Sequence, residues 1–387
     1  MNTWLVASVW LGLALVAGII SIRTGISVAM VEILVGVLAD NFLHLQPNEW
    51  GNFLAGLGAI VLTFLAGAEV DPAVLKKNLK ESLALGTVSF LFPFLAAFAY
   101  SYYLARWDLQ AALIAGIALS TTSVAIVYAV MVETGINATE LGQLILAGCF
   151  ITDLGTVLAL GVAFAHYDYW MLFFILATLF ILFLLPRLTP MFQRIFGGKI
   201  SQTEVKYTLF FLLLLGGLAT KAGSEAVLPA YLLGLCLADF FQRERELLFR
   251  MRAAAFALLT PFYFLKAGIY ISLPALWSSL ALIIILLLVK VAAKFIGVWP
   301  LTRLFRWEVR EGMYTTLLMS TGLTFGTISS LYGLTHRLIN QQQYSVLVTV
   351  VILSGVIPTL IAQAFFYPKG TKEKEAVSKA IPAKEER

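Results

Sequence analysis

The chain has 387 residues, of which 60% are hydrophobic and only 13% are charged. A soluble domain carries about 25% charged residues and needs them to cover its surface. This composition therefore excludes a soluble globular protein and indicates a polytopic membrane protein. The net charge of +5 does not indicate nucleic-acid binding, because the basic residues fall in short clusters between apolar segments.

Apolar segments of about 20 residues, the length needed to cross the hydrocarbon core, recur along the whole chain. We expect about thirteen membrane helices, near residues 3–22, 25–44, 52–69, 82–104, 108–132, 141–165, 169–187, 206–221, 226–241, 251–270, 275–300, 309–333 and 343–367. The segment at 206–221 is short, so twelve helices is the alternative. Residues 368–387 are charged and free of aromatic side chains, which predicts a disordered tail.

The basic residues predict the orientation, because cytoplasmic loops carry most of the Lys and Arg in membrane proteins. The odd-numbered loops and the tail hold 21 of the 27 basic residues, and the even-numbered loops hold three. The other three, Lys266, Lys290 and Lys294, lie inside predicted helices. We therefore expect the N-terminus outside and the C-terminus in the cytoplasm. The first apolar segment lacks a basic leader and a cleavage site, so it is expected to be a retained helix.

Short motifs recur at a spacing close to 200 residues: GVLAD (36–40) with GLCLAD (234–239), FLAG (64–67) with FLKAG (264–268), and Ser120-Thr121 with Ser320-Thr321. This spacing covers seven predicted helices, and an odd number inverts the second copy. The pattern predicts an inverted-topology repeat with a substrate site near the membrane midplane. The expected organisation is a six-helix repeat at 1–168, a linking helix and cytoplasmic loop at 169–205, a second six-helix repeat at 206–367, and the tail at 368–387.

The same helix of each half carries a polar cluster near its middle: Ser120, Thr121, Thr122 and Ser123 in the first, and Ser320, Thr321, Gly322 and Thr324 in the second. Hydroxyl groups satisfy backbone groups that an interrupted helix leaves free, and glycine favours an interruption. We therefore predict two broken helices that direct opposing dipole ends at one point. The alternative is that these small residues only allow close helix packing.

Asp153 is the only carboxylate placed deep within a predicted helix. Such a group is costly in a bilayer, which makes it a functional candidate. It can hold a proton or, as a carboxylate, a Na⁺ or K⁺ ion with hydroxyl oxygens, including that of Thr152, completing the coordination. The structural alternative is a salt bridge to Lys294 or Lys290, which are four residues apart on one helical face.

Other charged residues are weaker candidates for the ion site. Lys266 is next to a proline-containing segment, and Glu32, Glu69 and Asp71 lie nearer to helix ends, where we interpret them as packing residues that also have access to an ion path. The histidines lie far apart, and both cysteines are in apolar segments, so we expect no zinc site, no cofactor and no enzyme activity. The histidines are His44, His166 and His336.

The chain resembles the monovalent cation:proton antiporter-2 family, the prokaryotic Na⁺/H⁺ and Kef-type K⁺/H⁺ antiporters. The resemblance covers roughly residues 5–366 and rests on VEILVGVL (31–38), FLAGAEVD (64–71), ALSTTSVAI (118–126), LILAGCFITD (144–153) and PFYFLKAG (261–268). It implies a homodimer in a prokaryotic cell (inner) membrane, with a dimerisation domain, a core domain around two crossed broken helices, an elevator-like motion and a role in pH homeostasis.

In this resemblance, Asp153 matches the family's ion-binding aspartate and Lys294 its core lysine. Thr122 and Ser123 fall on the first broken helix, and residues 319–326 on the second. Two departures stand out. Thr152 occupies the position where electrogenic members have a second aspartate, and the second break lacks the acidic residue that would pair with Lys294. Lys266 stands where relatives mostly have a neutral residue. We assign Lys266, like Lys290, a structural role in supporting the core.

These features predict a secondary active transporter that exchanges a monovalent cation, Na⁺ first and K⁺ second, for protons. With one titrating carboxylate the exchange is expected to be electroneutral. The alternative is a sodium-coupled symporter of an organic solute on the same fold. A passive channel is disfavoured by the single repeat-related site, and an intramembrane enzyme by the lack of histidine at membrane depth.

Overall fold

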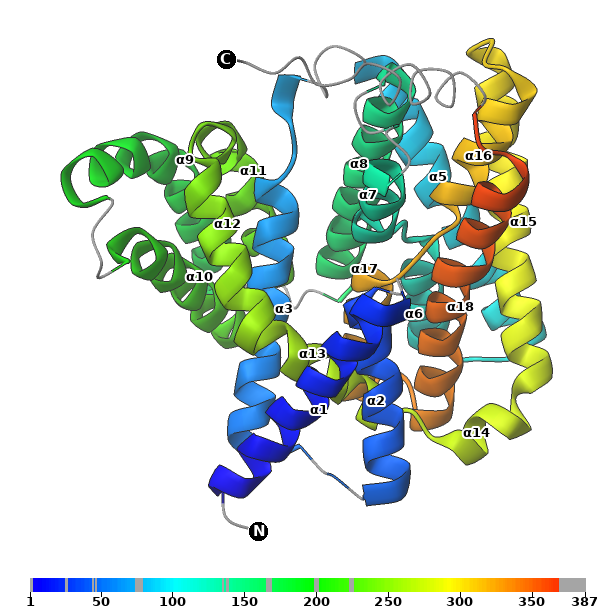
Figure 1. The fold of residues 1–387 in the computed structure, drawn as a ribbon, viewed down its shortest axis with the longest axis horizontal. Coiled ribbons are helices and arrows are strands. Elements are labelled where there is room, and N and C mark those ends of the chain that lie inside the picture. Colours follow the sequence, from blue (N-terminus) through cyan, green and yellow to red (C-terminus); the bar gives the residue numbers. More distant parts are fainter. Residues whose placement is uncertain are drawn as a thin grey trace, which may run out of the picture.

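The computed structural model is built of helices (Figure 1). It describes residues 3–24, 27–43, 45, 47–73, 79–133, 136, 139–164, 169–197, 202–222 and 226–368. In these ranges, nine helices are long and apolar enough to cross a membrane. The predicted tail at 369–387 lies outside the described residues, as do His44, His166, Lys76, Lys77 and Lys199.

The first half contains α1 (Thr3–Thr24), α2 (Val28–Leu43), α3 (Glu49–Ala68), α5 (Leu79–Ala99) with its π-helical extension η1 (Tyr100–Leu104), α6 (Leu109–Ser120), α7 (Val124–Glu133) and α8 (Glu140–Ala163). The second half contains α9 (Tyr169–Phe196), α10 (Thr203–Lys221), α11 (Val227–Arg243), α12 (Arg245–Ala254), η3 (Ala255–Leu259), α13 (Thr260–Ile269), α14 (Leu273–Ser278), α15 (Leu280–Leu304), α16 (Val309–Met319), α17 (Thr324–Thr335) and α18 (Gln341–Phe365). The all-helical prediction is confirmed.

Polar residues set several helix starts. The Asn48, Asp108 and Thr139 side chains each accept a hydrogen bond from a backbone N–H group in the first turn of α3, α6 and α8. At the start of α18, Asn340 and Gln343 form a capping box. Each cap satisfies a backbone donor that the helix itself leaves free, so these polar residues define where an otherwise apolar segment begins.

Several segments differ from their predicted bounds. α9 continues to Phe196, nine residues beyond the predicted end, with Pro186 and Pro190 inside it. The segment predicted at 251–270 begins earlier, as α12, and reaches α13 through a π-helical turn. The segments predicted at 108–132 and 309–333 are each divided into two shorter helices, α6 with α7 and α16 with α17. These divisions are the predicted broken helices.

The helices pack in two groups, which lie on opposite sides of Figure 1 apart from the central α1, α2 and α13. The first packing group comprises α1–α3 and α10–α13, with α9 against α10 and α11. The second packing group comprises α5–α8 and α15–α18. The two groups meet where α11 packs against α8, and there the Tyr231 hydroxyl donates a 3.0 Å hydrogen bond to the backbone oxygen of Phe150.

Glycines allow very close approach at two related places in the first packing group. A β-carbon on Gly36 of α2 would lie 3.0 Å from the Cα atom of Gly268 on α13. A β-carbon on Gly234 of α11 would lie 3.1 Å from the carbonyl carbon of Gly67 on α3. All four glycines belong to the motifs that recur about 200 residues apart. GVLAD (36–40) packs against FLKAG (264–268), and FLAG (64–67) packs against GLCLAD (234–239).

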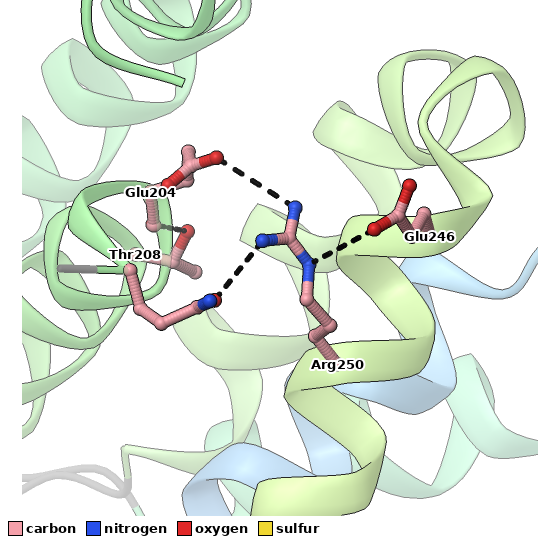
Figure 2. Close-up of polar contacts among 5 residues, drawn as sticks. Glu204, Thr208, Glu246 and Arg250 are labelled. Atoms are coloured by element: carbon pink, nitrogen blue, oxygen red, sulfur yellow. Dashed lines mark hydrogen bonds and ion pairs between the residues drawn. The ribbon is translucent and has the colours of Figure 1, made fainter. Parts of the chain in front are cut away.

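A charged cluster joins α10 to α12 within this group (Figure 2). Arg250 lies between the two helices, with its guanidinium 3.7 Å from Glu204 and 3.9 Å from Glu246, and it donates a 3.1 Å hydrogen bond to Gln202. The Thr208 hydroxyl donates to the backbone oxygen of Glu204. Since Glu204 is buried, these contacts attach the start of α10 to α12.

Candidate functional site

The two helix breaks lie against each other. α6 ends at Ser120 and α7 begins at Val124, while α16 ends at Met319 and α17 begins at Thr324. The Thr122 hydroxyl donates a 3.0 Å hydrogen bond to the backbone oxygen of Met319. In return, the backbone N–H of Ser123 donates to the Thr321 hydroxyl over 3.3 Å. Each break therefore satisfies backbone groups of the other, as in the crossed arrangement that the sequence predicts.

The hydroxyls of the breaks also satisfy their own chain. The Ser120, Thr121, Ser320 and Thr321 hydroxyls each donate to a carbonyl oxygen three or four residues earlier. The backbone of Thr121 is extended, with φ −62° and ψ 152°. The predicted residues Ser120 to Ser123 and Ser320 to Thr321 are all buried. Polar side chains thus replace the helical hydrogen bonds that an interruption removes, which is required where no water is available.

Lys294, on α15, occupies the first break. Its ammonium group donates three hydrogen bonds, to the Ser89 hydroxyl at 2.7 Å, to the backbone oxygen of Ser120 at 3.0 Å, and to the Thr122 hydroxyl at 3.0 Å. The oxygen of Ser120 belongs to the C-terminal end of α6, where the helix dipole is negative. A cation there is favourable, and the side chain is completely buried. The structural role of Lys294 in the core stays a prediction.

Lys290, one turn earlier on α15, occupies the second break. Its ammonium group donates a 3.0 Å hydrogen bond to the Ser354 hydroxyl on α18. It also lies against Gly322, because a β-carbon added to that glycine would overlap the Lys290 nitrogen. The two lysines, one helical turn apart, therefore contact different breaks. Lys290 is completely buried as well.

Asp153 lies near the middle of α8 with only 1% of its surface exposed. Its Oδ1 atom has no hydrogen-bond partner among the described residues. No lysine or arginine nitrogen of those residues lies within 4.0 Å of its carboxylate, although Lys294 acts on it electrostatically. The tight salt bridge that was the alternative role for this residue is therefore not formed. A buried carboxylate oxygen with no partner is costly, so it has unused capacity for a proton or a cation.

The neighbours of Asp153 connect it to the second break and to the first packing group. Cys149, one turn earlier on α8, has its sulfur 3.8 Å from the Met319 sulfur at the end of α16. Thr152, the predicted partner in ion binding, uses its hydroxyl proton in a 2.7 Å bond to the backbone oxygen of Cys149. A hydroxyl coordinates a cation through its oxygen lone pairs, which this hydrogen bond does not use. The ring of Tyr231 lies 6.1 Å from that of Phe325 in α17.

A cavity of about 410 Å³ lies between the two packing groups, on the side where α3 and α11 end. Its polar residues include Glu69 and Arg252, which form an ion pair. The lining is completed by Asp71, Val124, Tyr128, Gln143, Leu146, Ala147, Phe150, Gln242, Arg245, Leu248 and Phe249. It reaches Val124, the first residue after the first break, and Phe150, one turn before Asp153. The carboxylates predicted to be near an ion path, Glu69 and Asp71, thus line a cavity that approaches the crossing.

Two predicted residues lie apart from the crossing. Lys266, on α13, lines a different cavity and forms no hydrogen bond with either break. Glu32, on α2, is buried, and its Oε2 atom has no hydrogen-bond partner in the described part of the chain. Thr324 starts α17, next to the crossing. The structure therefore brings together Asp153, the two helix breaks, Lys290 and Lys294.

Sequence reasoning missed three residues of this region: Ser89, Ser354 and Tyr231. Ser89 and Ser354 accept hydrogen bonds from Lys294 and Lys290, and Tyr231 connects α11 to α8. Each of these hydroxyl residues is flanked by apolar residues, and a serine in such a helix commonly bonds to its own helix backbone. Only the partner, which lies 64 to 205 residues away in the sequence, distinguishes them.

Known proteins are similar to this chain in sequence and in fold. Over 358 residues it is 27% identical to a protein of Methanocaldococcus jannaschii named Probable Na(+)/H(+) antiporter 3, with 90% of this chain and 91% of that protein covered. It is 25% identical over 366 residues to a Na(+)/H(+) antiporter of Enterococcus hirae, with 89% and 93% covered.

The solved structure of the sodium proton antiporter MjNhaP1 from Methanocaldococcus jannaschii at pH 8 superposes with a TM-score of 0.68, covering 94% of this chain and 98% of that chain, at 14% identity. This similarity shows the sodium/proton antiporter fold. Residues 11–366 match the family described as sodium/hydrogen exchanger, transmembrane. Because the match covers most of the chain, the protein belongs to this family of multi-pass membrane proteins, as the sequence resemblance predicted.

Proposed function

We propose that the protein exchanges a monovalent cation, Na⁺ first and K⁺ second, for protons across the membrane, and that Asp153 binds both in turn. The observation that carries the proposal is the buried carboxylate oxygen of Asp153 that has no hydrogen-bond partner in the described chain. It lies beside two helix breaks rich in hydroxyl and carbonyl oxygens, which are ligands for a hard cation. The names of the relatives in M. jannaschii and E. hirae point to the same exchange.

The breaks and the lysines prepare the site. Two helix C-termini and two N-termini meet at the crossing. Lys294 lies at the C-terminal end of α6, and Lys290 lies against Gly322 within the second break. The positive ends of α7 and α17 remain to favour a carboxylate nearby. The carboxylate thus keeps its capacity to exchange ions while the lysines hold the backbone in place. We assign Thr122, Ser123 and Thr152 as further oxygen donors for the cation.

The cavity beside Glu69 serves, in this proposal, as the cytoplasmic half of the path. The distribution of basic residues favours that orientation, with the N-terminus outside and the C-terminus in the cytoplasm. Relative movement of the two packing groups would then expose Asp153 to the other side, as in an elevator. Each group contributes matching motifs from both halves of the chain, which supports the inverted repeat at 1–168 and 206–367. The family resemblance supports a homodimer in a prokaryotic inner membrane.

With one carboxylate alternating between one cation and one proton, no net charge moves in a cycle, so the exchange is electroneutral. The experiment that tests the proposal uses sealed vesicles with a preset pH gradient and a fluorescent pH indicator. Addition of Na⁺ or K⁺ alone should collapse the gradient. A collapse that needs an added organic solute would instead identify a sodium-coupled symporter. A series of Li⁺, Na⁺, K⁺ and Rb⁺ then ranks the cations.

A further inference from the structure

A second cavity, of about 240 Å³, lies at the opposite end of the α3 and α11 pair from the first one. It contacts Ala55 near the start of α3 and Val227 at the start of α11, whereas the first cavity contacts the ends of both helices. α10, α13 and α17 provide the other walls. The cavity is therefore separate from the one that approaches Asp153.

Lys266 is the only charged residue among those that line this cavity. Only 8% of the surface of Lys266 is exposed. It forms no hydrogen bond and no ion pair with any residue that the structure describes, and its nitrogen lies 6.0 Å from the centre of the Tyr270 ring. An ammonium group buried without a partner is strongly unfavourable. Among the described residues that line the cavity there is no carboxylate.

Tyr263 provides a second unused donor. It lies three residues before Lys266 on α13, so both side chains project from one face of the helix, and both line the cavity. The Tyr263 hydroxyl is buried and has no hydrogen-bond partner within the described ranges. Thr220 of α10 and Thr335 of α17 add hydroxyl groups to the lining. Two buried donors, one of them cationic, thus line a space that has no acidic residue among its described lining residues.

We propose that this cavity is a binding site for a small singly charged anion. The Lys266 ammonium would pair with the anion and the Tyr263 hydroxyl would donate a hydrogen bond to it. A volume of about 240 Å³ accepts a halide or a small oxyanion together with water, since one water molecule occupies about 30 Å³. A free chloride ion and the phosphate group of an anionic lipid share this chemistry. The site is independent of Asp153 and goes beyond the cation exchange proposed above.

Anion binding should appear as stabilisation, because a ligand that binds only the folded state raises the unfolding temperature. The experiment measures thermal unfolding of the full chain in a neutral detergent, in choline chloride and in choline gluconate of equal concentration. Choline keeps Na⁺ and K⁺ absent, so the Asp153 site does not contribute. Chloride should raise the unfolding temperature of the wild type, and the rise should be lost in Lys266→Met and reduced in Tyr263→Phe.

The control is Lys206→Met, which removes an exposed lysine at the other end of α10 and should keep the full chloride effect. If Lys266→Met does not fold, Lys266→Gln and Tyr263→Phe provide the comparison. Nanodiscs of phosphatidylcholine or phosphatidylglycerol, both without chloride, test the lipid source. Stabilisation by phosphatidylglycerol that depends on Lys266 would identify a lipid phosphate. The proposal is overturned if neither anion stabilises the wild type, or if the lysine variants respond as the wild type does.

Discussion

The ammonium nitrogen of Lys290 and the backbone of Gly322 are in contact across the second helix break. The glycine leaves the space that the lysine fills, and the lysine is fixed by its hydrogen bond to Ser354. One turn later on the same helix, Lys294 contacts the first break through Ser120 and Thr122. One face of α15 thus supports both breaks. Substitution of each lysine, or of the break residue that it contacts, therefore tests the pairing.

Gly322→Ala should destabilise the protein because the new β-carbon would overlap the Lys290 nitrogen. Overpacking of this kind costs about 1–3 kcal/mol. Lys290→Met removes the overlapping nitrogen but keeps most of the side-chain length, so adding it to Gly322→Ala should restore much of the loss. Thermal unfolding of the two single variants and the double variant measures this coupling. Purely additive effects would contradict a direct contact.

Thr122→Val should weaken the connection between the two breaks. The Thr122 hydroxyl accepts from Lys294 and donates to the backbone oxygen of Met319, and valine of similar shape does neither. Loss of bonds of this kind costs about 1–3 kcal/mol. We expect a lower unfolding temperature and slower exchange. The matched control is Thr63→Val in α3, because the buried Thr63 hydroxyl bonds only to its own helix, at Ala59; equal losses in both variants would argue against a special role for Thr122.

Asp153→Asn should abolish cation-dependent collapse of a pH gradient while the protein still folds and inserts. The amide keeps the shape of the carboxylate but cannot carry the negative charge that binds a cation. Asp239→Asn is the control, since Asp239 is exposed and pairs with Arg243 at a helix end. Vesicle assays and size-exclusion profiles of both variants check this prediction. Normal exchange by Asp153→Asn would exclude this residue as the binding site.

Competition of a cation and a proton for one carboxylate predicts a specific pH dependence. In the acidic range, where the site is mostly protonated, the apparent KM for Na⁺ should rise about tenfold for each unit that the pH falls, by mass action. The maximal rate at saturating Na⁺ should change far less. Initial rates at several Na⁺ concentrations and pH values test this. A maximal rate that falls with pH at constant KM would mean that proton and cation do not share the site.

Electroneutral exchange predicts that transport is insensitive to membrane potential. Proteoliposomes with K⁺ and valinomycin fix the potential, and Na⁺-driven proton movement is then measured at positive, zero and negative values. Rates should agree within experimental error, because Asp153 exchanges one positive charge for another. Strong voltage dependence would show that a second group, such as Lys294, also changes its charge in the cycle.

The broken helices were predictable because their signal is local and occurs twice. Hydroxyl residues next to each other in an apolar segment are unusual, and Ser120-Thr121 and Ser320-Thr321 recur at the repeat spacing. The partners of the lysines were not predictable in the same way. Lys294 bonds to Ser89 and Ser120, which lie 205 and 174 residues away. Ser120 belongs to a recognisable polar cluster, but nothing near Ser89 distinguishes it from other serines in apolar helices.

The amino-acid sequence is sufficient to predict that this protein spans a membrane, where its helices are interrupted, and that Asp153 lies in the middle of a membrane helix. These properties depend on the free energy of transferring short segments into a lipid bilayer, which their composition sets. The packed fold was needed to show that Asp153 forms no ion pair within 4.0 Å with a lysine or arginine of the described residues. It was also needed to show that Lys290 and Lys294 contact different breaks and that Lys266 lines a separate cavity. Those outcomes depend on how far each helix is rotated and shifted against its neighbours, which is set by packing between segments far apart in the chain.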